Sequence, residues 1–187
     1  MKWMIASDIH GSAFYCRRLL DAYKQEQAQR LLLLGDILYH GPRNDLPQEY
    51  APKEVASLLN AIRQEVLCVR GNCESEAEQM VLRFPVMADY CLLPLENRVL
   101  FATHGHHYNP ETPPPLSPGD ILLNGHTHVP ACRELPGTAE TASLIYMNPG
   151  SVSIPKENSW HGYMTLEDGL FMWKDLDGCV QMQKRFE

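Results

Sequence analysis

The first half of the sequence alternates short apolar runs with helical periodicity, and this pattern restricts the fold more than any other feature. Residues 2–7, 31–34 and 66–69 have the length and composition of buried strands. Between them, apolar residues recur at helical spacing over 16–23 and 55–62. An alternating order of strands and helices predicts parallel strands joined by right-handed crossovers. We therefore expect an α/β fold.

The second half consists of short strand-like runs separated by turns. Turn signals at 96–98, 168–169 and 177–178 predict hairpins. A short helix is also expected over 75–84, before Pro85. Two packed mixed sheets with helices outside would accommodate both halves, so we expect one domain over 1–187. The predicted strands of this half are 89–95, 99–103, 121–123, 144–147, 163–166, 170–173 and 180–186.

Composition restricts the function. The chain has a net charge of −7, whereas most nucleic-acid-binding proteins have a basic surface that neutralises phosphates. No long nucleic acid is therefore expected as a partner. The six cysteines form no C-x-x-C pair, which indicates reduced thiols and a cytoplasmic location. No run reaches membrane-spanning length, and the apolar start is too short for a secretory signal. We expect no membrane partner, and homo-oligomerisation is left open.

Five polar motifs each follow an apolar run directly. Open α/β sheets place their ligands at strand ends, because the loops that leave one sheet edge converge there. Each motif alone is weak evidence, but their shared placement at strand ends predicts a single site. The candidate metal ligands are Asp8, His10, Asp36, Asn72, His104, His126 and His128.

The ligand types indicate the kind of metal. Carboxylate, amide and imidazole groups together suit Mn²⁺, Fe²⁺ or Zn²⁺ better than Ca²⁺. Seven ligands exceed the number that one transition-metal ion requires, so we expect two divalent metal ions that share a bridging carboxylate.

The same motifs resemble a known family. SDIHG at 7–11, GD at 35–36, GNCE at 71–74, THGH at 103–106 and GHTH at 125–128 resemble, in order, the calcineurin-like metallophosphoesterase superfamily. HGPRN at 40–44 and NPGSVSIPK at 148–156 make the chain similar to a subgroup of small bacterial phosphodiesterases. The resemblance implies a four-layer α/β/β/α sandwich of two packed mixed sheets. It also implies hydrolysis of small phosphodiesters by a hydroxide that bridges two metals.

The resemblance also divides the ligands and assigns catalytic residues. It implies Mn²⁺, with Fe²⁺, Zn²⁺ or Ni²⁺ as alternatives. Asn72, Cys73 and His104 are the implied catalytic residues. The first metal would be held by Asp8, His10, Asp36 and His128, and the second by Asp36, Asn72, His104 and His126.

Cys73 departs from the usual family pattern. Most members have a histidine after Gly-Asn, which is thought to protonate the leaving oxygen, whereas this chain has a thiol with a reference pKa of about 8.5. We therefore expect weaker catalysis on alkyl esters than on aryl or phosphorylated ones, with His40 as the candidate substitute acid. Asn148 and Ser151 are expected to shape a strand end beside the metals. The expected substrate-binding residues are His40, Arg43, Asn44 and His106.

Two alternatives remain. A phosphomonoesterase of the same fold is barely distinguishable by sequence. A non-catalytic metal-binding scaffold is the other, since fold alone does not establish function. All seven ligands are present, which argues against a scaffold, because buried carboxylates and imidazoles are costly to keep together without metal.

Overall fold

The computed structural model describes residues 1–186 and begins with the predicted alternation of strands and helices. β1 (Trp3–Ala6) pairs in parallel with β2 (Arg30–Leu33), and β2 pairs in parallel with β3 (Val66–Cys68). The crossovers are α1 (Ala13–Gln25) and α2 (Pro52–Ala61). The parallel sheet expected of the first half is confirmed.

Local chemistry defines where the helices begin. The Ser12 hydroxyl accepts the Tyr15 N–H at 3.2 Å and caps α1. Pro52 occupies the first turn of α2, where its missing N–H costs nothing. Within residues 1–186, no helix combines the length and hydrophobicity required to cross a bilayer.

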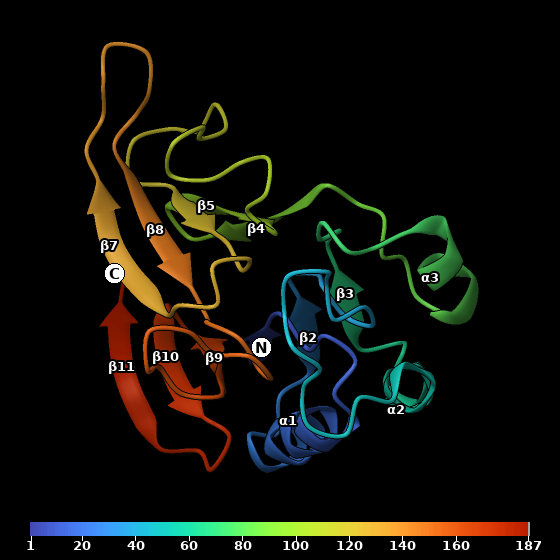
Figure 1. Ribbon diagram of the computed structural model, residues 1–187. Coiled ribbons are helices and arrows are strands. Elements are labelled where there is room, and N and C mark those ends of the chain that lie inside the picture. The colour runs from blue at the N-terminus through green and yellow to red at the C-terminus, as the bar shows by residue number, and fades with distance from the viewer. Residues whose placement is uncertain (187) are drawn as a thin grey trace.

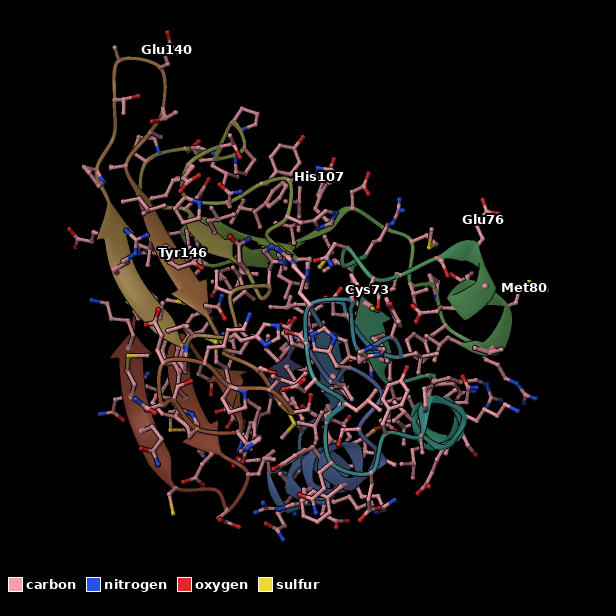
Figure 2. The ribbon with its side chains drawn as sticks, in the orientation of Figure 1. Cys73, Glu76, Met80, His107, Glu140 and Tyr146 are labelled. Atoms are coloured by element: carbon pink, nitrogen blue, oxygen red, sulfur yellow. The ribbon has the colours of Figure 1, made fainter. Side chains whose placement is uncertain are left out.

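The third helix is shorter than predicted. α3 covers Glu76–Val81 and ends there, because Leu82 turns to extended backbone and is buried with Phe84 against the helix-covered side of the sheet. Glu76 and Met80 project outward from α3 (Figure 2), and Met80 is 86 % exposed.

Eleven strands in the described residues form two mixed sheets (Figure 1). The first sheet has the order β11-β10-β9-β1-β2-β3, and β9 runs antiparallel to β1. The second has the order β4-β5-β6-β8-β7, in which β5, β6 and β8 are parallel. The remaining strands are β4 (Tyr90–Leu95), β5 (Arg98–Thr103), β6 (Ile121–Leu123), β7 (Ala131–Leu135), β8 (Leu144–Asn148), β9 (Gly162–Glu167), β10 (Leu170–Asp175) and β11 (Val180–Arg185).

The three predicted hairpins are present, but one strand was not predicted. β7 is an edge strand that pairs only with β8, and Arg133 and Glu134 are exposed on it. An edge strand needs no continuous apolar run, so β7 lacks the pattern that predicted the other strands.

Side chains alternate between the two faces of each sheet. Along β1, Met4 and Ala6 pack against the helices, whereas Ile5 faces the second sheet. Leu100 of β5 and Trp173 of β10 belong to the same central cluster as Ile5. The expected sandwich of two packed mixed sheets is confirmed.

The outer layer of the second sheet is not helical. Phe101, Leu122 and Tyr146 form a cluster on that face, and Leu116 of the 104–120 loop packs against it. No helix in residues 1–186 contributes to this cluster. The loop carries five prolines, and proline cannot continue a helix. A loop therefore forms the layer for which a helix was expected.

Candidate metal centre

All seven predicted ligands lie at the carboxyl ends of parallel strands. Residues after β1, β2 and β3 of the first sheet face residues after β5 and β6 of the second. The site therefore lies between the ends of the two sheets. From the first sheet come Asp8, His10, Asp36 and Asn72, and from the second come His104, His126 and His128.

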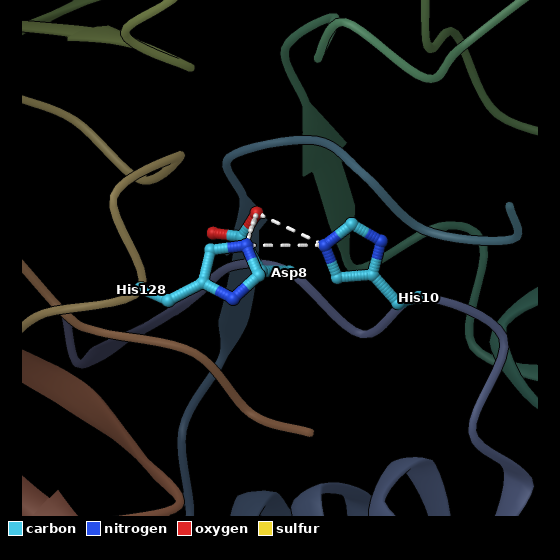
Figure 3. Close-up of side chains that lie close together, drawn as sticks. All are labelled: Asp8, His10 and His128. Carbon is cyan, nitrogen blue, oxygen red and sulfur yellow. Dashed lines mark hydrogen bonds and ion pairs between the residues drawn. The ribbon is translucent and has the colours of Figure 1, made fainter. Parts of the chain in front are cut away.

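One group of ligands consists of Asp8, His10 and His128 (Figure 3). Asp8 Oδ1 lies 3.2 Å from His128 Nε2 and 3.5 Å from His10 Nε2. The two Nε2 atoms are 3.2 Å apart. All three side chains are buried, and Asp8 Oδ1 has no hydrogen-bond donor in the described residues. A buried carboxylate oxygen without a donor fits a cation ligand.

The second group lies on the other side of Asp36. His104 Nε2 is 3.5 Å from Asp36 Oδ1 and 3.1 Å from Asn72 Oδ1. His126 Nδ1 is 3.2 Å from His104 Nε2. The other Asp36 oxygen, Oδ2, is 3.7 Å from His10 Nε2. Asp36 thus presents one oxygen to each group, which suits a carboxylate that bridges two metals.

Backbone carbonyls orient three of the imidazoles. The Nδ1 atoms of His10, His104 and His128 lie 2.8, 2.6 and 2.6 Å from the carbonyl oxygens of Tyr39, Leu34 and Ile154. A carbonyl can only accept, so each Nδ1 carries a proton. In the neutral imidazole, which is the form that binds a metal, Nε2 then presents a lone pair to the site. Facing lone pairs 3.2 Å apart repel each other unless a cation lies between them. The donor set therefore fits a metal.

The electrostatics of the site keep its carboxylates ionised. Burial opposes ionisation of Asp8, but contacts with His10 and His128 hold its pKa well below the ordinary value. Burial likewise opposes ionisation of Asp36, and the His104 contact lowers its pKa. Burial disfavours the imidazolium form of His104, yet Asp36 raises its pKa to about 9. The charged carboxylates attract cations.

Five of the seven ligands have left-handed backbone. The φ angles are 59° at Asp8, 49° at His10, 54° at Asp36, 66° at His126 and 64° at His128. Non-glycine residues rarely adopt positive φ, at a cost of about 1–3 kcal/mol each. Such strain persists only where the surroundings impose it, and it concentrates at functional sites.

Glu74 holds two of the strand-end loops together. Its carboxylate accepts the N–H groups of Asp36 at 2.9 Å, Ile37 at 2.7 Å and Gly71 at 2.5 Å. The side chain is buried. The sequence assigned no role to Glu74, and only its place after Gly-Asn-Cys distinguishes it from an ordinary loop glutamate.

Serines of the 148–156 segment fix the Asp8 backbone. Ser151 Oγ donates to the Asp8 carbonyl at 2.9 Å, and Ser153 Oγ donates to it at 3.0 Å. Asn148 Nδ2 donates to the Gly125 carbonyl at 2.7 Å, just before His126. Asn148 and Ser151 lie where the sequence placed them, whereas Ser153 had no predicted role.

Cys73 contacts the central carboxylate. Its N–H donates to Asp36 Oδ1 at 2.9 Å, and its thiol donates to Asp36 Oδ2 at 3.2 Å. Burial and the Asp36 carboxylate raise the pKa of Cys73. The thiol thus remains protonated at neutral pH.

A cavity of about 410 Å³ opens beside the ligands, and two of the four predicted substrate-binding residues line it. These are Arg43 and Asn44, which lie with Asp36, Asn72 and Cys73. Three cavities are larger. Those of about 630 and 540 Å³ contain no predicted ligand, whereas one of about 440 Å³ is lined by His126 on its other side.

The other two predicted substrate-binding residues are not among the lining residues. The His40 ring packs edge-on against Tyr50, with centroids 5.2 Å apart. His106 lies beside the His104 ring, at 5.5 Å, and burial with the nearby His104 lowers its pKa to about 4. Neither imidazole is brought to the cavity.

Comparison with known proteins agrees with this geometry. Residues 1–168 match the calcineurin-like phosphoesterase superfamily domain. The chain is 46% identical over 168 residues to phosphodiesterase YfcE of Escherichia coli strain K12, covering 90% of this chain and 88% of the relative.

Solved structures show the same fold. The structure of YfcE, described as a phosphoesterase from E. coli, superposes with a TM-score of 0.91 at 43% identity and full coverage of both chains. Vps29 of Entamoeba histolytica, complexed with zinc, shares the fold at 19% identity, a TM-score of 0.61 and full coverage of both chains. The resemblance seen in the motifs is confirmed, and the chain belongs to the calcineurin-like phosphoesterase superfamily.

Proposed function

We propose that this chain is a metal-dependent hydrolase that cleaves small phosphodiesters. The observation that carries the proposal is the position of Asp36, whose two oxygens face two separate groups of ligands. The family match and the similarity to a protein named phosphodiesterase support this reaction class.

The proposed metals are two Mn²⁺ ions, with Fe²⁺, Zn²⁺ or Ni²⁺ as alternatives, because the donors are mixed oxygen and nitrogen atoms. Bound there, they would lower the pKa of a water molecule and polarise the phosphoryl oxygens. Asp36 would contact both metals. The remaining ligands would be Asp8, His10 and His128 for the first, and Asn72, His104 and His126 for the second.

Residues of the cavity would hold the phosphodiester. Asn44 donates its side-chain amide to the His40 carbonyl at 2.8 Å, which fixes the amide beside Arg43. Arg43 is exposed and makes no ion pair within residues 1–186, so its guanidinium is available for the non-bridging oxygens. His40 would contribute through its backbone, because its ring does not line the cavity.

The leaving group should determine the rate. The Cys73 thiol donates a hydrogen bond to Asp36, and its raised pKa makes it a poor acid for a departing oxygen. We predict that aryl phosphodiesters react at least about 100-fold faster in kcat than matched alkyl esters, since general acid catalysis is worth about 10²–10⁴. Rapid-quench measurement of the chemical step tests this. Similar rates for both esters would reveal another proton donor.

A substrate panel tests the function itself. Purified protein loaded with Mn²⁺ should hydrolyse aryl diesters, and Asn72→Ala and His104→Ala should each lower kcat/KM by at least about 100-fold. His107→Ala is the matched control, because its exposed ring lies outside the ligand groups. Undiminished activity in both ligand variants would refute the assigned site.

The same panel separates the alternative functions. A phosphomonoesterase would turn over aryl monoesters with a higher kcat/KM than diesters. A non-catalytic scaffold would bind Mn²⁺ and cleave neither.

We also propose a cytoplasmic location and a single domain over 1–187. All six cysteines are free, as expected in a reducing compartment. The cluster between the sheets takes side chains from both halves of the chain, which supports one folding unit.

A further inference from the structure

A lysine outside the predicted set also lines the cavity beside the ligands. Lys156 lies in the loop between β8 and β9, whereas Arg43 lies in the loop between β2 and α2. Two cations from separate loops therefore border the same space of about 410 Å³.

The backbone of Lys156 is tied to a metal-ligand candidate. Lys156 N–H donates to the His128 carbonyl at 3.2 Å, and His128 Nδ1 donates to the Ile154 carbonyl at 2.6 Å. The Lys156 carbonyl accepts two hydrogen bonds from Ser159, one from its N–H at 3.0 Å and one from its hydroxyl at 2.6 Å. These contacts hold the base of the lysine side chain in a defined place beside the site.

The Lys156 ammonium group has no acidic partner in the described residues. Lys2 and Lys174, by contrast, both pair with Glu26, at 2.5 and 2.6 Å. Lys156 is exposed and makes no ion pair within residues 1–186, and Asp36 is the one acidic residue among those that line the cavity. In a protein with a net charge of −7, an unpaired lysine and an unpaired arginine at one cavity leave local positive charge to be balanced.

Charge accounting indicates what the balancing group is. The positive charge of two divalent cations would exceed the negative charge of the Asp8 and Asp36 carboxylates by about two units. A hydroxide nucleophile and a singly charged phosphodiester already neutralise that excess. Arg43 and Lys156 then leave about two further positive charges, which matches a phosphate monoester group of −1.5 to −2 at neutral pH.

We propose that Lys156 is a substrate-binding residue and that the preferred substrate is a phosphodiester that carries a second phosphate group on one of its alcohols. This inference rests on the proposed function. Arg43 would contact both phosphates, and Lys156 would bind only the phosphate that is not cleaved.

Two matched esters test the proposal. One is 4-nitrophenyl 2-methoxyethyl phosphate, which has no free hydroxyl to attack its own phosphorus, and the other carries a phosphate group in place of the methoxy group. Release of 4-nitrophenol reports only diester cleavage. We expect the phosphorylated ester to be preferred about tenfold in kcat/KM through a lower KM, because one charge-assisted contact corresponds to about that factor.

Substitutions assign the preference to the lysine. Lys156→Gln should reduce the preference to about twofold or less, and Lys156→Arg should keep most of it. Lys53→Gln is the control, because Lys53 lines the separate cavity of about 630 Å³. Equal use of both esters by the wild type, or an unchanged preference in Lys156→Gln, would overturn the inference. Cleavage of neither ester would instead refute the proposed function.

A binding measurement gives a readout without turnover. Propane-1,3-diyl bisphosphonate has no ester bond to cleave, and propylphosphonate is its match with one phosphonate group. Calorimetry on the Mn²⁺-loaded protein should show tighter binding of the bisphosphonate, by about tenfold, and loss of this difference in Lys156→Gln. Equal affinity of the wild type for both ligands would contradict the role of Lys156.

Discussion

Gly71 shows how little space surrounds the shared carboxylate. A Cβ atom at this position would lie 2.2 Å from Asp36 Oδ1 and 2.6 Å from the Asp36 backbone nitrogen. Gly71→Ala must therefore displace Asp36, and we expect unfolding in urea to show a loss of about 1–3 kcal/mol. Metal analysis after dialysis should show weaker binding of both ions, because Asp36 faces both ligand groups.

A second glycine provides the control for Gly71→Ala. No atom lies within 4 Å of a Cβ built on Gly119, and at its φ of +85° asparagine is strained less than most other non-glycine residues. Gly119→Asn should leave metal binding unchanged. A Gly71→Ala variant that also retains full metal affinity would show that Asp36 need not hold its present position.

At the residue scale, the sequence revealed the ligands but not how they are held. Asp, Asn and His at strand ends are visible as motifs, and the structure brings all seven together. Five of the ligands have a positive φ, and the Glu74 carboxylate accepts hydrogen bonds from three backbone N–H groups. No pattern in the sequence reveals either feature. The rings of His40 and His106 also depend on tertiary packing, which motif position does not specify.

At the scale of elements, the first turn of α3 contains a titrating group. The Ser75 hydroxyl accepts the Glu78 N–H, and Glu78 Oε2 is buried without a hydrogen-bond partner in residues 1–186. Burial and the nearby Glu74 raise the pKa of Glu78 to about 7.

This raised pKa predicts a pH-dependent stability. The folded state binds the Glu78 proton more tightly than the unfolded chain, so its stabilising contribution is complete below about pH 4.5 and is lost as the pH rises through 7. The glutamine of Glu78→Gln cannot ionise, and glutamine is also favoured three residues after a serine that caps a helix. Thermal unfolding of metal-free protein should show the variant more stable than wild type at about pH 8, with the difference shrinking toward about pH 4.5.

The exposed Glu76 on the same helix provides the comparison. Glu76→Gln should show no such convergence at low pH. A difference between Glu78→Gln and wild type that stays constant with pH would contradict the titration of Glu78.

Strands with a buried face could mostly be predicted from the sequence, and exposed β11 could be predicted from the turn signal that precedes it. The alternation along β1, β2 and β5 follows from burial on both sides of a sheet. β7 lies at an edge with exposed charges, and α3 ends early because Leu82 and Phe84 are buried outside the helix. Long-range packing determines both cases.

At the scale of the whole molecule, metal binding and stability should be linked. Asp8 and Asp36 are buried as charged groups, so cations that neutralise them favour the folded state. Free Mn²⁺ at 100 times its Kd should add about 2.7 kcal/mol, which raises the Tm by roughly 5–10 °C for a chain of this size. Differential scanning fluorimetry of EDTA-treated protein during Mn²⁺ titration measures this rise.

The bridging ligand supplies the control for the metal titration. Asp36→Ala removes an oxygen from each group, so its Tm should respond weakly to Mn²⁺. If Mn²⁺ raised the Tm of Asp36→Ala as much as that of the wild type, the stabilising ion would bind elsewhere on the protein.

The position of β1 between β2 and β9 has a consequence for protein synthesis. β9 covers Gly162–Glu167, so the sheet that supports Asp8 gains its second neighbour only when most of the chain has left the ribosome. His104, His126 and His128 also emerge after the first three strands. Each group of ligands is therefore completed only after the histidines of the second half have emerged, so a metal ion would meet its full set of ligands late in synthesis.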